Sequence, residues 1–78
     1  MELSELNELI ASVLDVEAET LNDDSGRLTL EVWDSMAHLN IIAAVEETYE
    51  VMFSTAEMRE LTTIRALRAM LAQRNQAV

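Results

Sequence analysis

Apolar residues recur at steps of three and four along three stretches of the chain, which is the spacing of one face of an α-helix. The first stretch lies near the start of the sequence, and glutamate and serine side chains occupy the positions between its apolar residues. Its apolar positions are Leu3, Leu6, Ile10, Val13 and Leu14. The pattern predicts an amphipathic helix over residues 2–14.

The second stretch covers residues 35–50. At 100° per residue, five of its side chains share one helical face. They are His38, Ile41, Ile42, Val45 and Tyr49. We expect this face to belong to the core.

The last stretch opens with Ser54-x-x-Glu57, the pattern of a capping box, and predicts a short helix through Leu61. A threonine, Thr62 or Thr63, is then expected to cap a final helix. The core stripe of that helix is Ile64, Leu67, Met70 and Leu71. Residues 73–78 are expected to fray.

A long loop, residues 15–34, separates the first two helices. The segment 22–26 reads Asn-Asp-Asp-Ser-Gly, which is turn chemistry. Connections longer than about 12–15 residues are usually packed functional loops or disordered segments. Spaced apolar residues favour the packed kind and are expected to pin the loop onto the core: Val16, Leu21, Leu28, Leu30 and Val32.

The amino-acid composition indicates the fold class. The 78 residues are 50% apolar and include one glycine, no proline and no cysteine. We expect one all-α domain over residues 1–78, a small four-helix bundle of three longer helices and one short helix with a long first loop. The lack of cysteine excludes disulfides, thiolate chemistry and cysteine-ligated zinc. The single glycine excludes a glycine-rich phosphate loop.

The net charge of the chain limits the classes of partner that it can bind. The net charge is −10, lysine is absent, and Arg27 is the only base in residues 1–50, against thirteen acids. Nucleic acids and anionic lipids attract basic surfaces, so a basic protein surface is the better partner for this chain. Without an apolar run of about 20 residues or a positively flanked leader, the sequence predicts a cytoplasmic protein with no membrane span.

The face of the second helix opposite its expected core face combines apolar and acidic residues. Its members are Met36, Leu39, Ala43, Glu46, Glu47 and Glu50, and we call this set the docking face. An apolar centre beside acidic residues is typical of a surface that anchors and steers a partner. The alternative is that Leu39 joins the core through a neighbouring loop.

The start of this helix reads Asp34-Ser35-Met36, which resembles the Asp-Ser-Leu attachment motif of the acyl carrier protein family. The first helix, the long loop, the run 39–49 and the segment 61–64 resemble that family in order and spacing. The resemblance implies that Ser35, flanked by Asp34 and Met36, carries phosphopantetheine through a phosphodiester. It further implies a carrier without catalytic activity, which holds acyl cargo as a thioester on the thiol of that arm.

The implied partners are a phosphopantetheinyl transferase, acyl-loading ligases or transferases, and synthases of lipid or secondary-metabolite synthesis with basic docking surfaces. We expect a monomer, and the Met1 start suggests a free-standing protein. Two alternatives stay open: a peptidyl or D-alanyl carrier, and an acidic helical interaction module with no covalent arm.

Two residues depart from the family pattern: Met36 replaces the usual leucine, and Trp33 stands where a small residue is common. Methionine conserves bulk. We expect Trp33 to cover the core under the loop rather than to contact cargo. Ser35 falls in the first helical turn, where free backbone N–H groups favour an anion. The alternative interpretation of this position is an ordinary helix N-cap, provided by Asp34 or Ser35.

Two competing chemistries are discounted. His38 lies one turn after Ser35, but a hydrolytic pair would need an orienting third group and an oxyanion site, so a histidine at the edge of the core is expected. The segment before Gly26 suggests a calcium loop, yet aligning Gly26 with the invariant loop glycine puts Leu21 and Val32 at ligand positions. We therefore expect no specific metal site.

Overall fold

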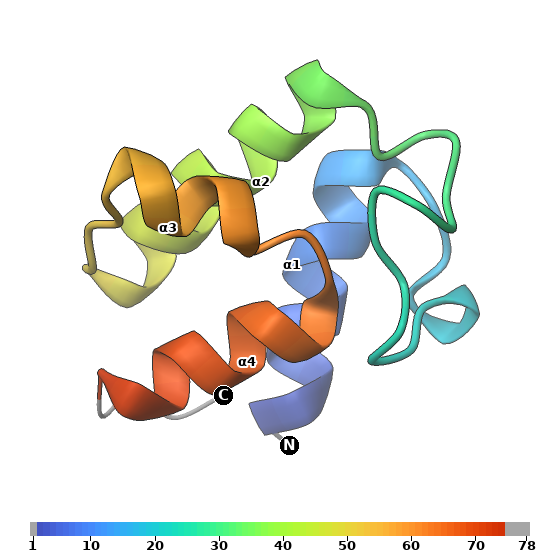
Figure 1. The fold of residues 1–78 in the computed structure, drawn as a ribbon. Helices are drawn as coiled ribbons and strands as arrows, with labels where there is room; N and C mark the ends of the chain where they lie inside the picture. The colour runs from blue at the N-terminus through green and yellow to red at the C-terminus, as the bar shows by residue number, and fades with distance from the viewer. Residues whose placement is uncertain (1, 75–78) are drawn as a thin grey trace.

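A computed structural model describes residues 2–74, with side chains from residue 5 onward. Its helices are α1 (Glu2–Leu14), a short 3-10 helix η1 (Ala18–Thr20), α2 (Ser35–Tyr49), α3 (Thr55–Glu60) and α4 (Ile64–Gln73). In Figure 1 the loop between α1 and α2 runs along the side of the bundle away from α3 and rises to the start of α2. The predicted all-α, acyl-carrier-like bundle is confirmed.

The core collects the predicted faces of the helices. Helix α1 contributes Leu6, Ile10, Ala11 and Leu14, helix α2 contributes Ile41, Ile42, Val45 and Tyr49, and helix α4 contributes Ile64, Leu67 and Leu71. Leu21, Trp33, Phe53 and Leu61 complete it from the connections. Val13 and Met70 are only partly buried against this cluster. The side chain of Leu3 and residues 75–78 of the expected frayed tail lie outside the described residues.

Side chains cap three of the helices at their N-termini. The Oδ1 atom of Asp34 accepts from the backbone N–H of Ala37 at 2.8 Å, and Thr63 rather than Thr62 caps α4. The predicted capping box is confirmed: Ser54 N–H donates to Glu57 Oε1 at 2.8 Å, and Glu57 N–H donates to Ser54 Oγ at 3.1 Å. These caps satisfy backbone donors that a helix start leaves unpaired, which is why each helix begins where it does.

Two of the expected loop anchors are wrong. Leu28 is 99% exposed and Val32 is 49% exposed, whereas Leu21 is buried and Val16 and Leu30 pack partly against the core. The reason is local backbone geometry. The carbonyl of Gly26 accepts from Leu30 N–H at 3.0 Å, and the carbonyl of Leu30 accepts from Trp33 N–H at 3.2 Å. Each exposed residue lies inside one of these turns, and its side chain faces away from the core.

The loop is instead held by the linker between α3 and α4. Arg27 N–H donates to the carbonyl of Thr62, and Ile64 N–H donates to the carbonyl of Ser25, both at 3.0 Å. Gly26 forms a single antiparallel bridge with Thr63, and a Cβ atom on Gly26 would overlap the Thr62 carbonyl oxygen. The one glycine of the chain is needed here for this close backbone approach.

Ion pairs reinforce the same attachment. Arg65 pairs with Asp24 at 2.8 Å, and Arg68 pairs with Asp23 and donates to Asn7 of α1 at 3.0 Å. Arg65 N–H also donates to the carbonyl of Asp23 at 2.9 Å. The acidic turn of the loop is therefore fastened to α4, and the segment that leads into Ser35 starts from a fixed point.

Candidate functional site

Ser35 is the first residue of α2, and Asp34 before it is the N-cap. The cap is made by the carboxylate of Asp34, so of the two capping alternatives the structure selects Asp34. Both side chains are exposed. The Ser35 hydroxyl is thus presented to solvent at the positive end of a 15-residue helix, with no role in holding that helix together.

Arg27 reaches the serine from the loop. Its Nη2 donates a hydrogen bond to Ser35 Oγ at 3.0 Å. Sequence reasoning noted Arg27 only as the single base among the first 50 residues and did not connect it with Ser35. The two residues are eight positions apart and separated by loop residues without periodicity, so only the tertiary attachment of residue 27 to Thr62 brings them together.

Trp33 and His38, which flank Ser35 in the sequence, form a buried and hydrogen-bonded pair. Trp33 is 1% exposed, and its indole Nε1–H donates to His38 Nδ1 at 3.0 Å, with ring centroids 6.2 Å apart. Because Nδ1 accepts, the hydrogen is assigned to Nε2, which donates to the carbonyl of Met58 at 2.8 Å. Both ring nitrogens are occupied away from Ser35, so no Ser-His pair forms. The expectations of a covering Trp33 and a core-edge His38 are confirmed.

The residues around Ser35 suit an anionic phosphodiester. The Oγ atom is exposed, it already contacts a guanidinium, and it lies at a helix N-terminus where backbone N–H groups favour negative charge. The nearby carboxylate of Asp34 is engaged with a backbone N–H. A phosphodiester on this oxygen would thus be exposed and would lie beside a guanidinium.

Most residues of the docking face are exposed. Met36 is 71% exposed and Leu39 is 61% exposed, so the alternative that Leu39 joins the core is wrong. Ala43, Glu47 and Glu50 are also exposed. Leu39 borders a cavity of about 230 Å³ between α2 and α3, which is lined by Arg27, His38, Leu39, Thr55, Met58 and Arg59.

Glu46 differs from the other acidic residues of the docking face. It is only partly exposed, and its Oε2 accepts from the backbone N–H of Phe53 at 2.9 Å. This carboxylate therefore fixes the connection between α2 and α3. Glu46 belongs to the docking face and also to the framework of the fold, which its helical spacing did not indicate.

Arg74, directly after α4, is bonded to α3 and to the connection between α2 and α3. The guanidinium of Arg74 pairs with Glu57 at 2.7 Å, donates to the carbonyl of Met52 and lies 5.4 Å from the centre of the Phe53 ring. The Ser54 backbone N–H, and then the Arg74 guanidinium, lower the pKa of Glu57. At Tyr49, the last residue of α2, burial raises the pKa of the phenol, and Glu5 adds to this effect while Arg68 opposes it.

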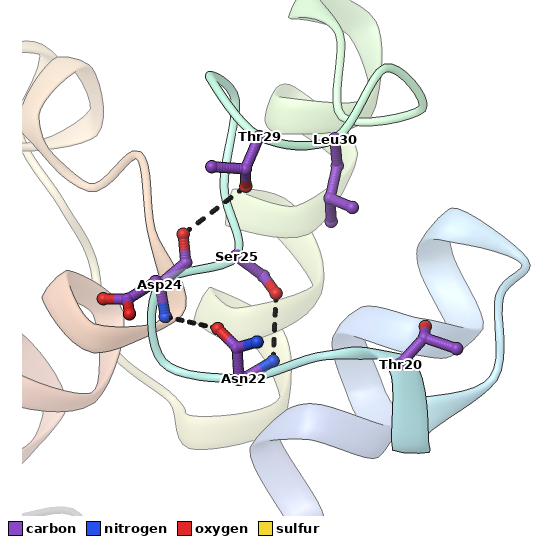
Figure 2. A pocket seen from close by; sticks show the side chains of 6 residues that line it. All are labelled: Thr20, Asn22, Asp24, Ser25, Thr29 and Leu30. Atoms are coloured by element: carbon purple, nitrogen blue, oxygen red, sulfur yellow. Dashed lines mark hydrogen bonds between the residues drawn. The ribbon is translucent and has the colours of Figure 1, made fainter.

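A second, polar pocket of about 300 Å³ lies within the long loop (Figure 2). Its side chains close the loop on itself. Asn22 Oδ1 accepts from Asp24 N–H at 2.8 Å, Ser25 Oγ accepts from Asn22 N–H at 2.9 Å, and Thr29 Oγ1 donates to the Asp24 carbonyl at 3.4 Å. In the described part of the chain, no three metal-ligating side chains come together. These polar groups serve the turn.

None of the helices within residues 2–74 is both long enough and apolar enough to cross a membrane.

Two comparisons with known proteins cover nearly all of this structure. The family model described as Phosphopantetheine attachment site matches residues 4–71. The acyl carrier protein of Streptomyces coelicolor (strain ATCC BAA-471 / A3(2) / M145) is 32% identical over 72 residues, which cover 91% of this chain and 78% of that protein. The matched region includes the long loop, Ser35 at the start of α2, and most of α4.

Proposed function

The chain belongs to the acyl carrier protein family, whose cofactor is phosphopantetheine, and from this premise we propose that Ser35 is the attachment residue. The observation that supports the proposal is the exposed hydroxyl of Ser35 in the first turn of α2, which Asp34 leaves free by capping the helix itself. When attached, phosphopantetheine supplies a terminal thiol that holds an acyl group as a thioester.

The other described serines have different surroundings. Ser25 is buried and accepts from Asn22, Ser54 is committed to the capping box of α3, and Ser12 lies within α1. Ser35 alone among the serines at positions 12, 25, 35 and 54 combines an exposed hydroxyl, a helix N-terminus and a neighbouring guanidinium.

The protein's own residues then present cargo rather than transform it. Asp34 caps the first turn of α2, and the hydrogen bond between Trp33 and His38 ties the end of the long loop to the same helix. A tethered thioester reaches an effective concentration on the millimolar scale at a docked enzyme, so weak and rapid docking is sufficient. We assign the docking to Met36 and Leu39 as apolar anchors and to Glu46, Glu47 and Glu50 as steering charges.

The partners of this surface follow from its chemistry. They are a phosphopantetheinyl transferase, loading ligases or transferases, and synthases of lipid or secondary-metabolite pathways, each presenting a basic surface to an acidic protein of net charge −10. A carrier of acyl groups is favoured over an interaction module because the docking face borders the exposed serine on the same helix.

The test is intact-protein mass after incubation with coenzyme A and a broad-specificity phosphopantetheinyl transferase, followed by peptide mapping. We expect one added phosphopantetheinyl group, located on Ser35. Ser35→Ala should fold and remain unmodified, because Asp34 retains the cap, whereas the matched control Ser12→Ala should be modified like the parent protein. No mass increase with several transferases, or attachment to another serine, would leave the acidic interaction module as the better explanation.

A further inference from the structure

We propose that Arg27 is a positioning residue for the modified serine: its guanidinium contacts the phosphodiester on Ser35 and holds the root of the arm. This inference rests on the proposed attachment at Ser35. It is carried by the hydrogen bond from Arg27 Nη2 to Ser35 Oγ at 3.0 Å.

The backbone holds Arg27 in place independently of the serine. Arg27 N–H donates to the carbonyl of Thr62 at 3.0 Å, and the preceding Gly26 is bridged to Thr63. The side chain therefore extends toward α2 from a backbone position in the long loop that is bonded to the linker between α3 and α4. Its contact with Ser35 is a product of the tertiary fold rather than of a freely moving loop.

The charges near Ser35 explain why a contact between Arg27 and the phosphodiester would be favourable. Attaching a phosphodiester adds one negative charge to a chain whose net charge is already −10, next to the carboxylate of Asp34. Three of the five arginines are engaged elsewhere, because Arg65, Arg68 and Arg74 pair with Asp24, Asp23 and Glu57. Within the described residues, Arg27 is the cation that contacts Ser35.

The chemistry of the two partners makes the contact stronger after modification. In the unmodified protein the guanidinium donates to a neutral hydroxyl oxygen. Esterification leaves Oγ as a bridging oxygen, and the negative charge resides on the non-bridging oxygens of the phosphorus bonded to it. Arginine has five N–H donors in a planar fork that matches phosphate geometry. Its hydrogen bonds to anions are stronger than its hydrogen bonds to neutral acceptors. Arg27 is already within reach of those oxygens.

Arg59 provides a matched control. It lines the same cavity between α2 and α3 as Arg27, and neither arginine takes part in an ion pair within the described residues. Arg59→Gln therefore removes the same charge from the same region without removing the contact to Ser35. If the arginines acted only through their charge, both substitutions would alter the effect of modification on stability. If Arg27 makes a specific contact, only Arg27→Gln would alter it.

The experiment compares unmodified and phosphopantetheinylated forms of the parent protein, Arg27→Gln, Arg27→Lys and Arg59→Gln at low salt. Modification should lower the Tm of Arg27→Gln by roughly 1–5 °C more than it lowers that of the parent protein. Arg59→Gln should match the parent, and Arg27→Lys should recover part of the difference. The ³¹P resonance of the phosphodiester should shift on Arg27→Gln and stay in place on Arg59→Gln. The Tm difference should shrink near 1 M salt, where the Debye length is about 3 Å.

Equal modification-induced Tm changes in the parent and Arg27→Gln, together with an unmoved ³¹P resonance, would overturn the inference and leave Ser35 as the attachment site. A folded Arg27→Gln that no transferase modifies would also overturn it, because Arg27 would then serve transferase recognition. Absence of modification on the parent protein would overturn both this inference and the proposed function.

Discussion

The indole of Trp33 donates its hydrogen bond to Nδ1 of His38 at 3.0 Å, and both side chains are buried. The same imidazole donates from Nε2 to the carbonyl of Met58. One histidine of α2 therefore joins this helix to the end of the long loop and to α3. Trp33, one of the two residues that depart from the family pattern, is thus part of a buried polar network.

Trp33→Phe should keep most of the buried ring area while removing the donor to Nδ1. We expect a loss of about 1–3 kcal/mol in the free energy of unfolding, because a buried acceptor is left without its partner. A double-mutant cycle with His38→Ala should give a coupling energy between the two sites of about 1 kcal/mol. Additive effects in urea denaturation would show that the hydrogen bond contributes little.

His38→Ala also separates a carrier from a hydrolase. We expect the variant to be less stable but still modified at Ser35, because His38 contacts Trp33 and Met58 rather than the serine. Intact-protein mass of the folded variant provides the measurement.

Gly26→Ala should destabilise the protein by about 1–3 kcal/mol, because the added Cβ would force the loop away from the Thr62 carbonyl. The φ angle of Gly26 is not positive, so the expected cost is steric and not conformational. Equilibrium urea denaturation measures the change. An unchanged or increased stability would mean that the loop accommodates the methyl group and that its attachment to the linker is loose.

Glu50→Gly should stabilise the protein. Glu50 ends α2 with a positive φ of 55°. A left-handed conformation costs a residue with a side chain about 1–2 kcal/mol, and the extra freedom of glycine in the unfolded chain offsets about 0.4–1 kcal/mol of the gain. We expect a net increase of about 0.5–1 kcal/mol. The control Glu47→Gly removes the same charge inside α2 and should cost about 1 kcal/mol. Effects of the same sign in both variants would contradict the assignment of Glu50 as a strained cap.

Lowering the pH should remove the stabilisation that ionised Glu57 gives to the folded protein. The fold lowers the pKa of this carboxyl, so it favours the ionised form, and the resulting stability is present above the ordinary glutamate pKa of about 4.3. That stability is lost as the pH falls through the lower folded pKa. Glu57→Gln should therefore lower Tm at neutral pH, and its difference from the parent should fade in acid. Glu60→Gln, at the exposed end of the same helix, controls for the loss of one negative charge.

Charge reversal should distinguish the two adjacent glutamates of the docking face. Glu47→Lys should slow association with a loading enzyme at low salt and leave the urea midpoint nearly unchanged, because Glu47 is exposed. Glu46→Lys should slow association and also destabilise the fold, because it removes the acceptor for Phe53 N–H. Association rates that are unchanged at low salt in both variants would remove these glutamates from the docking face.

Periodicity and capping chemistry predicted most of the secondary structure. The stripe 38, 41, 42, 45 and 49 is buried as expected, and Ser54 with Glu57 forms both bonds of its capping box. Such signals are readable because they depend on residues three or four apart on one helix. The position of Ser35 at the head of α2 was likewise predictable, since Asp34 caps the helix through a local hydrogen bond.

The long loop shows where such reasoning fails. Leu28 and Val32 are apolar, yet turns stabilised by the carbonyls of Gly26 and Leu30 direct them to solvent. The hydrophobicity of a residue indicates that its burial is favourable, but it does not predict which of several apolar loop residues reach the core. Trp33 takes that place, because its large ring covers the core and its N–H finds a partner in His38.

The sequence by itself thus determined the four helices, their buried faces, the mixed apolar and acidic composition of the exposed face of α2, and the serine at the helix start, because each depends on local periodicity, caps or charge. Only the tertiary structure decided that Arg27 contacts Ser35, that Glu46 accepts from Phe53, and that Gly26 lies against Thr62. These contacts join segments across turns and loops that have no repeating spacing. Their geometry is set by how the loop packs on the linker between α3 and α4, which no local pattern encodes.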